Sequence, residues 1–141
     1  MAIEYELHLS DPRPAEELLA AAGIGEVRGL SLTPGRPQAS RMHVIREAYG
    51  FTSRTDLLLR LDLSAYDADD GYAGNFSLVR VVMALLKAAQ GDAVLLFNWE
   101  QPLLLRRDGR VALNRDGAWC QSPSLRGLVD VPCTEESLPS L

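Results

Sequence analysis

Alternating apolar and polar residues predict a β-strand at the start of the chain. Every second residue from Ile3 to Leu9 is apolar, and the positions between them hold Glu4, Glu6 and His8. Successive side chains of a strand point to opposite faces, so a period of two describes a strand with one buried face.

Other segments complete the set of predicted strands. Residues 54–63 alternate in the same way, and residues 93–97 are apolar throughout, which is typical of a central strand covered on both faces. Asp108-Gly109 predicts a tight hairpin turn. The remaining strands are expected at residues 26–33, 41–48, 103–107 and 110–114.

Two helices are expected between these strands. The first follows Asp11-Pro12-Arg13-Pro14, where proline suits an opening helical turn, and it ends at Gly23. The second begins near Asn75 or Ser77 and continues to about Gln90, with only a narrow charged stripe along its apolar surface.

This order, β-α-β-β-β-α-β-β-β, indicates an α+β fold. Runs of strands separated by single helices favour an antiparallel sheet of six to seven strands with both helices on one face. With 141 residues the chain has the size of one domain. We expect that domain to span residues 1–133, and the Ser- and Pro-containing residues 134–141 to form a flexible C-terminal tail.

Charge and composition narrow the class of function. Nineteen acidic and fourteen basic residues give a net charge of −5, and only 6% of residues are aromatic. A nucleic-acid-binding protein needs a basic face and stacking aromatics, so nucleic acid is not an expected partner. The longest apolar stretch, residues 78–89, is too short to span a bilayer. No secretory signal is visible at the start, so we expect a cytoplasmic protein without a membrane partner.

No motif indicates catalysis, a cofactor or a metal. The acidic segment from Asp67 fails the EF-hand register, because glycine is not sixth and glutamate is not twelfth. His8 and His43 lie far apart in sequence, and Cys120 and Cys133 lack metal-ligand spacing. We therefore expect a binding protein rather than an enzyme, with the two cysteines as free thiols.

Two surface features are candidates for partner contact. Trp99 follows the central strand at a predicted turn, where it either anchors an interface or folds back over the core. An acidic loop could meet a basic partner. The predicted contact residues are Asp67, Asp69, Asp70, Trp99 and Glu100. The arginines around the 108–109 hairpin are expected to serve solubility and edge protection.

Two blocks of sequence carry a family resemblance. The first is Phe51 with TDLLLRLD at residues 55–62, and the second runs from VVMALL at 81–86 through GDAVLLFN at 91–98 to LLLRR at 103–107. With the opening IEYEL, these blocks resemble the small immunity proteins of bacterial swarming-inhibition toxin systems, the Sit-type immunity family. The resemblance covers most of residues 1–114. Trp99 departs from the family pattern, which has glycine there, and Leu63 stands where the pattern has lysine.

The resemblance implies a cytoplasmic protein that binds and neutralises a cognate toxin domain, without a cofactor or catalytic residue. Two alternatives remain open. The chain could be a structural or regulatory domain that forms a homodimer through a sheet edge and the tail. It could also bind a small molecule in a pocket between helix 75–90 and the sheet, lined by Asp56, Arg60 and His43.

Overall fold

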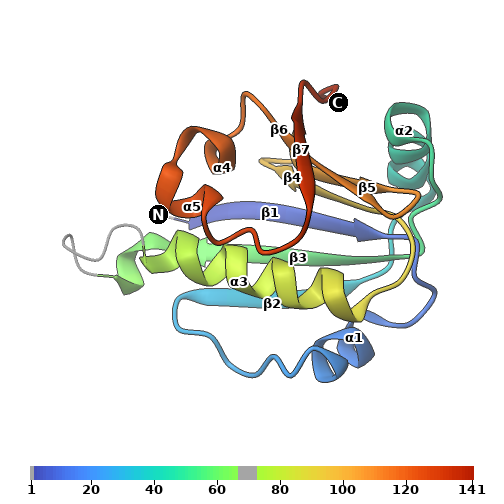
Figure 1. The fold of residues 1–141 in the computed structure, drawn as a ribbon. Helices are drawn as coiled ribbons and strands as arrows, with labels where there is room; N and C mark the ends of the chain where they lie inside the picture. The colour runs from blue at the N-terminus through green and yellow to red at the C-terminus, as the bar shows by residue number, and fades with distance from the viewer. Residues whose placement is uncertain (1, 67–72) are drawn as a thin grey trace.

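The computed structural model describes residues 2–66 and 73–141, which include one mixed sheet with the strand order β2-β3-β1-β4-β5-β6-β7 (Figure 1). All neighbouring strands are antiparallel except β6 and β7, which are parallel. The strands are β1 Ala2–Leu9, β2 Leu30–Gly35, β3 Thr55–Asp62, β4 Ala93–Phe97, β5 Gln101–Arg107, β6 Arg110–Asn114 and β7 Cys133–Glu136.

The α+β class predicted from the strand and helix pattern is confirmed. The sheet is mixed rather than purely antiparallel, because the segment after β6 crosses back before β7 begins. That segment forms two short helices, α4 and α5. The helices of the described residues are α1 Ala15–Ala21, α2 Ala39–Tyr49, α3 Ala73–Ala88, α4 Ala118–Gln121 and α5 Pro123–Arg126, with a 3-10 turn η1 at Leu63–Ala65.

The main core lies between one face of the sheet and α3. Leu7, Leu59 and Leu95 come from three neighbouring strands and are fully buried in it. The apolar stripe of α3 faces them, as the predicted amphipathic helix requires. α1, α4 and α5 contribute buried residues to the same core. Each fully buried leucine stabilises the fold by roughly 1.5–3 kcal/mol relative to an exposed one.

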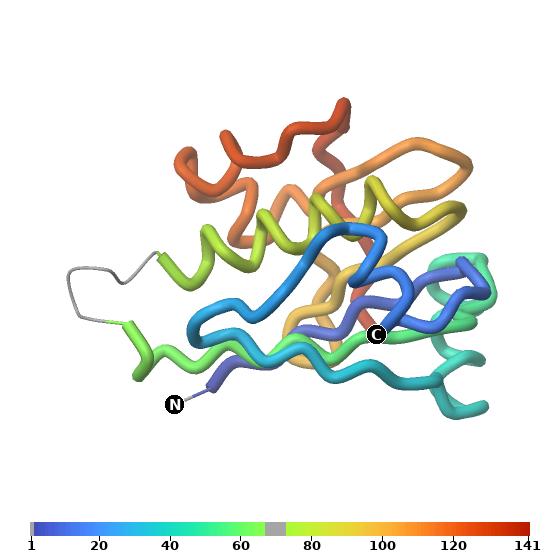
Figure 2. Tube along the Cα trace, turned by 90° about the horizontal axis from the view of Figure 1, so that it is seen from below, coloured from blue at the N-terminus to red at the C-terminus, as the bar shows by residue number. Residues whose placement is uncertain are grey.

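α2 covers part of the opposite face and builds a second, smaller core. Figure 2 shows α2 across the sheet from α3, near the end at which β3 begins. Ile45 and Tyr49 of α2 are buried against Val94 and Leu96 of β4. The central strand β4 is therefore covered on both faces, as its continuous apolar sequence predicted.

The strand predicted at residues 41–48 is wrong, because these residues belong to α2. Val44 and Ile45 favour a strand by propensity, but Ile45 and Tyr49 are four residues apart and share one helical face. Gly50 ends the helix in the left-handed conformation, with φ 79°. The two predicted helices therefore lie on one face, whereas this third helix lies on the other.

The second strand is displaced from its predicted position at residues 26–33. β2 begins only at Leu30, and Val27 makes one isolated bridge to it. Pro34 and Gly35, expected in a loop, finish the strand. Proline is tolerated there because β2 is an edge strand and needs donors on one side only.

The C-terminal residues run back to the β4–β5 turn. Residues 134–136, assigned to the tail in the sequence analysis, belong to β7 beside β6. Beyond them, the Tyr49 hydroxyl donates to the Pro139 carbonyl at 2.7 Å, and the Leu141 N–H donates to the Glu100 carbonyl at 2.9 Å. Of the helices in the described residues, none combines the length and the apolar character that crossing a membrane requires.

Candidate functional site

The β4–β5 turn presents Trp99 to solvent. Its side chain is 43% exposed, and within residues 2–66 and 73–141 it is the one large apolar side chain classed as exposed. Asn98 and Trp99 adopt positive φ values of 53° and 68°. Asparagine tolerates this conformation, but a tryptophan there costs on the order of 1 kcal/mol. The turn therefore holds an apolar side chain outside the core at a conformational cost, so Trp99 does not fold back over the core.

Three contacts fix Trp99 in this exposed position. The indole Nε1–H donates to Oε2 of Glu4 at 3.2 Å, and Nη2 of Arg41 donates to the Trp99 carbonyl at 2.5 Å. The Arg41 guanidinium also lies 5.7 Å from the centre of the indole ring, within cation–π range. A side chain that is exposed yet held in place loses little conformational entropy when a partner covers it.

A buried polar chain supports Arg41 from below. Arg41 Nε donates to Oε1 of Glu6 at 2.9 Å, and His8 Nε2 contacts the same oxygen. His8 Nδ1 lies 2.6 Å from the Ser53 hydroxyl oxygen. Glu6 is 4% exposed, and His8 and Ser53 are fully buried. The chain connects the interior beneath α2 to Trp99 at the surface.

The electrostatics of this chain favour an ionised Glu6. Burial alone would raise the pKa of Glu6, but the hydrogen bonds and charges of His8 and Arg41 outweigh it and the pKa is lowered. Oε2 of Glu6 has no hydrogen-bond partner within the described residues. Burial raises the pKa of Asp56, the cross-strand neighbour of His8. The predicted polar outer face of β1 is thus an interior polar layer where α2 covers it.

Ser53, His8 and Glu6 have the residue types of a catalytic triad, but their burial does not suit catalysis. A triad needs its nucleophile at a substrate-accessible surface. The Ser53 side chain is fully buried, and it bonds to Nδ1 while the carboxylate occupies Nε2. In this conformation the group joins β1 to the segment leading into β3 and anchors Arg41 of α2. Sequence reasoning missed it because the signal for a covering helix, Ile45 and Tyr49 followed by Gly50, was assigned to a strand.

The other predicted contact residues have different outcomes. Glu100 is exposed beside Trp99, and its carbonyl accepts the Leu141 N–H. Asp67, Asp69 and Asp70 lie outside the described residues. Where the small-molecule alternative placed its pocket, leucine and valine side chains of α3 and the sheet pack together in the main core. Asp56 and Arg60 lie on the opposite face of β3, and His43 is exposed on α2, so the structure does not gather these three there.

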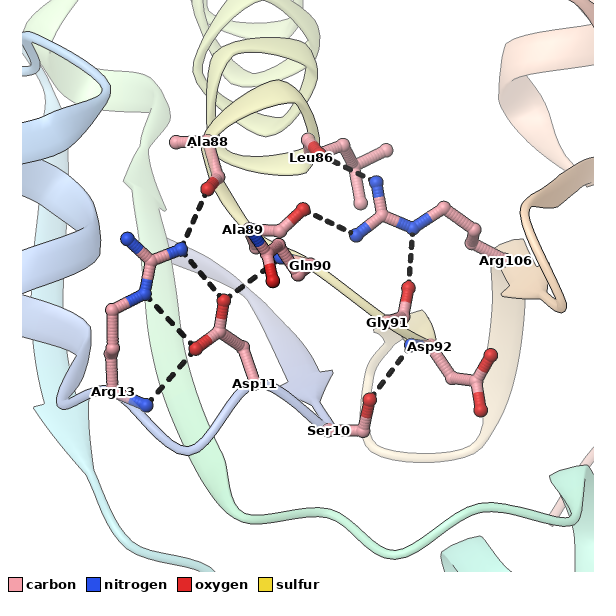
Figure 3. Close-up of polar contacts among 10 residues, drawn as sticks. All are labelled: Ser10, Asp11, Arg13, Leu86, Ala88, Ala89, Gln90, Gly91, Asp92 and Arg106. Atoms are coloured by element: carbon pink, nitrogen blue, oxygen red, sulfur yellow. Dashed lines mark hydrogen bonds and ion pairs between the residues drawn. The ribbon is translucent and has the colours of Figure 1, made fainter.

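Arg106, one of the arginines near the 108–109 hairpin, bonds to the end of α3 (Figure 3). Arg106 of β5 donates to the carbonyls of Leu86, Ala89 and Gly91 at the end of α3. Arg13 donates to the Ala88 carbonyl at 2.8 Å, on the other side of the same helix end. Cations at a helix C-terminus offset its partial negative charge. Arg106 therefore caps α3 rather than forming a free basic surface.

The cysteines of the described residues are both free thiols. Burial, with a smaller contribution from Glu135, raises the pKa of Cys120 to about 11. A thiol with that pKa is a weak nucleophile at neutral pH. No group of three or more metal-ligating His, Cys, Asp or Glu side chains occurs in the part of the chain that the structure describes.

The fold is that of a small α+β protein, and its β4–β5 turn presents an exposed tryptophan held by Glu4 and Arg41. A model of the SitI3-like family matches residues 3–123. The chain therefore belongs to the SitI3-like family, which is a Sit-type immunity family. The match extends from β1 into the beginning of α5 and leaves β7 outside. No curated protein and no solved structure matches the chain.

Proposed function

We propose that this chain is a cytoplasmic immunity protein that binds a cognate toxin domain and blocks it by protein–protein contact, without catalysing a reaction. Membership of the SitI3-like family over residues 3–123 is the observation that carries this proposal. The swarming-inhibition setting, with a toxin delivered by a sibling cell, belongs to the same proposal through the resemblance in GDAVLLFN and its flanking blocks.

The proposed contact surface consists of Glu4, Arg41, Trp99 and Glu100. Tryptophan and arginine are the residue types most enriched among side chains that dominate binding energy. Here the two types contact each other, and Arg41 holds the tryptophan before any partner arrives. The strained φ of Trp99 supports a binding role, because backbone strain of this kind clusters at functional sites. Asp67, Asp69 and Asp70 remain predicted contacts for a basic region of the partner.

The test requires a candidate toxin domain, which is sought among the products of the neighbouring genes. Co-expression of the two should restore growth, and calorimetry should give a specific dissociation constant. Trp99→Ala should weaken binding about 30-fold or more, because removal of a central anchor typically costs 2 kcal/mol or more. Growth protection should fall in parallel.

Arg80→Ala provides the matched control. Arg80 is exposed on α3, across the sheet from the proposed surface, and makes no hydrogen bond or ion pair with the described residues. It should leave affinity unchanged. Equal affinity of the Trp99 variant and the parent protein would remove this surface assignment, and failure of the toxin to bind the parent protein would remove the proposed function.

A further inference from the structure

A cavity of about 590 Å³ opens at the end of the sheet where β1 begins and β4 ends. This volume falls in the usual range of ligand pockets. β1, β4, β5, the first turn of α3 and α4 all contribute lining residues. Phe97 and Gln101 belong to the lining and flank the turn that carries Trp99, but Ile3, Tyr5 and Phe97 face the main core, so the cavity opens on the face of the sheet opposite Arg41.

Aromatic residues of β1, β4 and α4 belong to the lining of the cavity. Tyr5, Phe97 and Trp119 all line it. The rings of Tyr5 and Phe97 are 5.5 Å apart at their centres and tilted by 48°, and Trp119 is 2% exposed. Aromatic faces attract cations, and sets of rings around one cavity recur in proteins that recognise ammonium groups.

The polar groups of the cavity have free hydrogen-bonding capacity. Tyr5 is 6% exposed, yet its hydroxyl makes no hydrogen bond with the described residues. Burial raises the pKa of Tyr5 to about 12, so the hydroxyl stays neutral at physiological pH. The Asn75 side chain, at the start of α3, also has no hydrogen-bond partner there. Both groups can therefore form a hydrogen bond with a bound ligand.

The charge of the lining favours a cationic ligand. Asp116 supplies a carboxylate at the exposed rim, and no lysine, arginine or histidine occurs among the described lining residues. An anion would therefore lose its hydration without meeting an opposite charge. A cation would meet the carboxylate and the aromatic lining together.

We propose that this cavity receives an arginine or lysine side chain of the protein partner. The aliphatic stem of that side chain would pack against Ile3 and Leu103, while its charged head lies among the rings and near Asp116. Arginine and lysine suit such a site because their stems are apolar and their heads are charged. The inference rests on the proposed function for its partner, but its test does not need that partner.

The test titrates the isotopically labelled protein with N-acetyl-arginine methylamide and follows amide and indole cross-peaks by NMR. Matched probes are the corresponding citrulline, lysine and glutamate derivatives; citrulline has the shape of arginine without its charge. Capped arginine or capped lysine should shift the signals of Tyr5, Phe97 and the Trp119 indole. Capped citrulline should bind at least about tenfold more weakly, and capped glutamate should cause no shift. Equal binding of arginine and citrulline, or no shift with either cation, would overturn the proposal.

Asp116→Asn should lower the affinity for capped arginine about three- to tenfold, as expected for loss of a partly exposed charge pair. Asp108→Asn, the same change at the distant hairpin, should leave it unchanged. Agmatine tests whether the cavity instead binds a free small cation. If agmatine binds a hundredfold more tightly than capped arginine, the assignment to a side chain of the partner is overturned. If the toxin binds the parent protein and Asp116→Asn equally well, the cavity assignment fails while the proposed function stands.

Discussion

Arg41 joins the buried polar chain to the exposed tryptophan, so replacing it tests whether the two act together. Arg41→Met keeps an unbranched side chain but removes both charge-assisted hydrogen bonds, to Glu6 and to the Trp99 carbonyl. It also removes the cation–π contact and leaves the buried Glu6 carboxylate with His8 alone. Each charge-assisted bond contributes roughly 1.5–3 kcal/mol, but one quarter of the Arg41 side chain is exposed, so solvent screening reduces the sum. We expect a total loss of about 2–3 kcal/mol in the free energy of unfolding.

Urea unfolding followed by far-UV circular dichroism measures this loss. The midpoint should fall while the slope stays the same, because the folded state remains as compact as before. In a Trp119→Phe background, which leaves Trp99 as the remaining tryptophan, the Arg41→Met change should shift emission to the red and increase quenching by acrylamide. Arg46→Met is the control, because Arg46 lies on the same helix, is exposed and has no side-chain partner among the described residues. Equal stability and equal quenching of the Arg41 and Arg46 variants would refute the reasoning.

Three further outcomes follow from the structure. The Arg13 hydrogen bonds hold the pKa of Asp11 far below its usual value, so the ionised carboxylate stabilises the fold fully above pH 4 and this stabilisation is lost on acidification below pH 4. Acid unfolding curves should show that the stability of Asp11→Asn depends less on pH in this range. Gly50→Ala should cost about 1 kcal/mol in thermal or urea unfolding, because φ 79° is strained for any residue with a Cβ, and an unchanged midpoint would contradict the assigned helix end. Cys120, with its pKa raised to about 11, should react with iodoacetamide at pH 7.5 far more slowly than free cysteine; mass spectrometry of the labelled peptide would reveal an activated thiol if labelling were fast.

Local periodicity was enough to predict the elements of the main core. The strands β1 and β3 follow from their period-two alternation, and α3 follows from its continuous apolar stripe. In each case the apolar side chains can leave water only by packing against other elements. The continuous apolar run of β4 also predicted cover on both faces. What covers the second face was not predicted, because residues 41–48 of α2 were assigned to a strand.

In the candidate site, too, one part is visible in the sequence and another part only in the structure. Trp99 stands out in the sequence because a tryptophan beside Asn98 and Glu100 interrupts a strand pair at a turn. The buried residues beneath Trp99 do not stand out in the sequence, because Glu6 and His8 have the pattern of the solvent-facing side of a half-buried strand. They are buried only because a helix more than thirty residues further along the chain lies over them, and Arg41 of that helix meets Glu6.

The sequence by itself therefore determined the α+β class, the main strands and helix of the core and the position of the β4–β5 turn, because each depends on local patterns that a short segment carries alone. Tertiary structure decided the parallel return of β7, the helix over the second face, the polar chain from Ser53 to Trp99 and the aromatic-lined cavity on the opposite face of the sheet. These features depend on contacts between segments far apart in the chain, and no local periodicity records which segment will cover another.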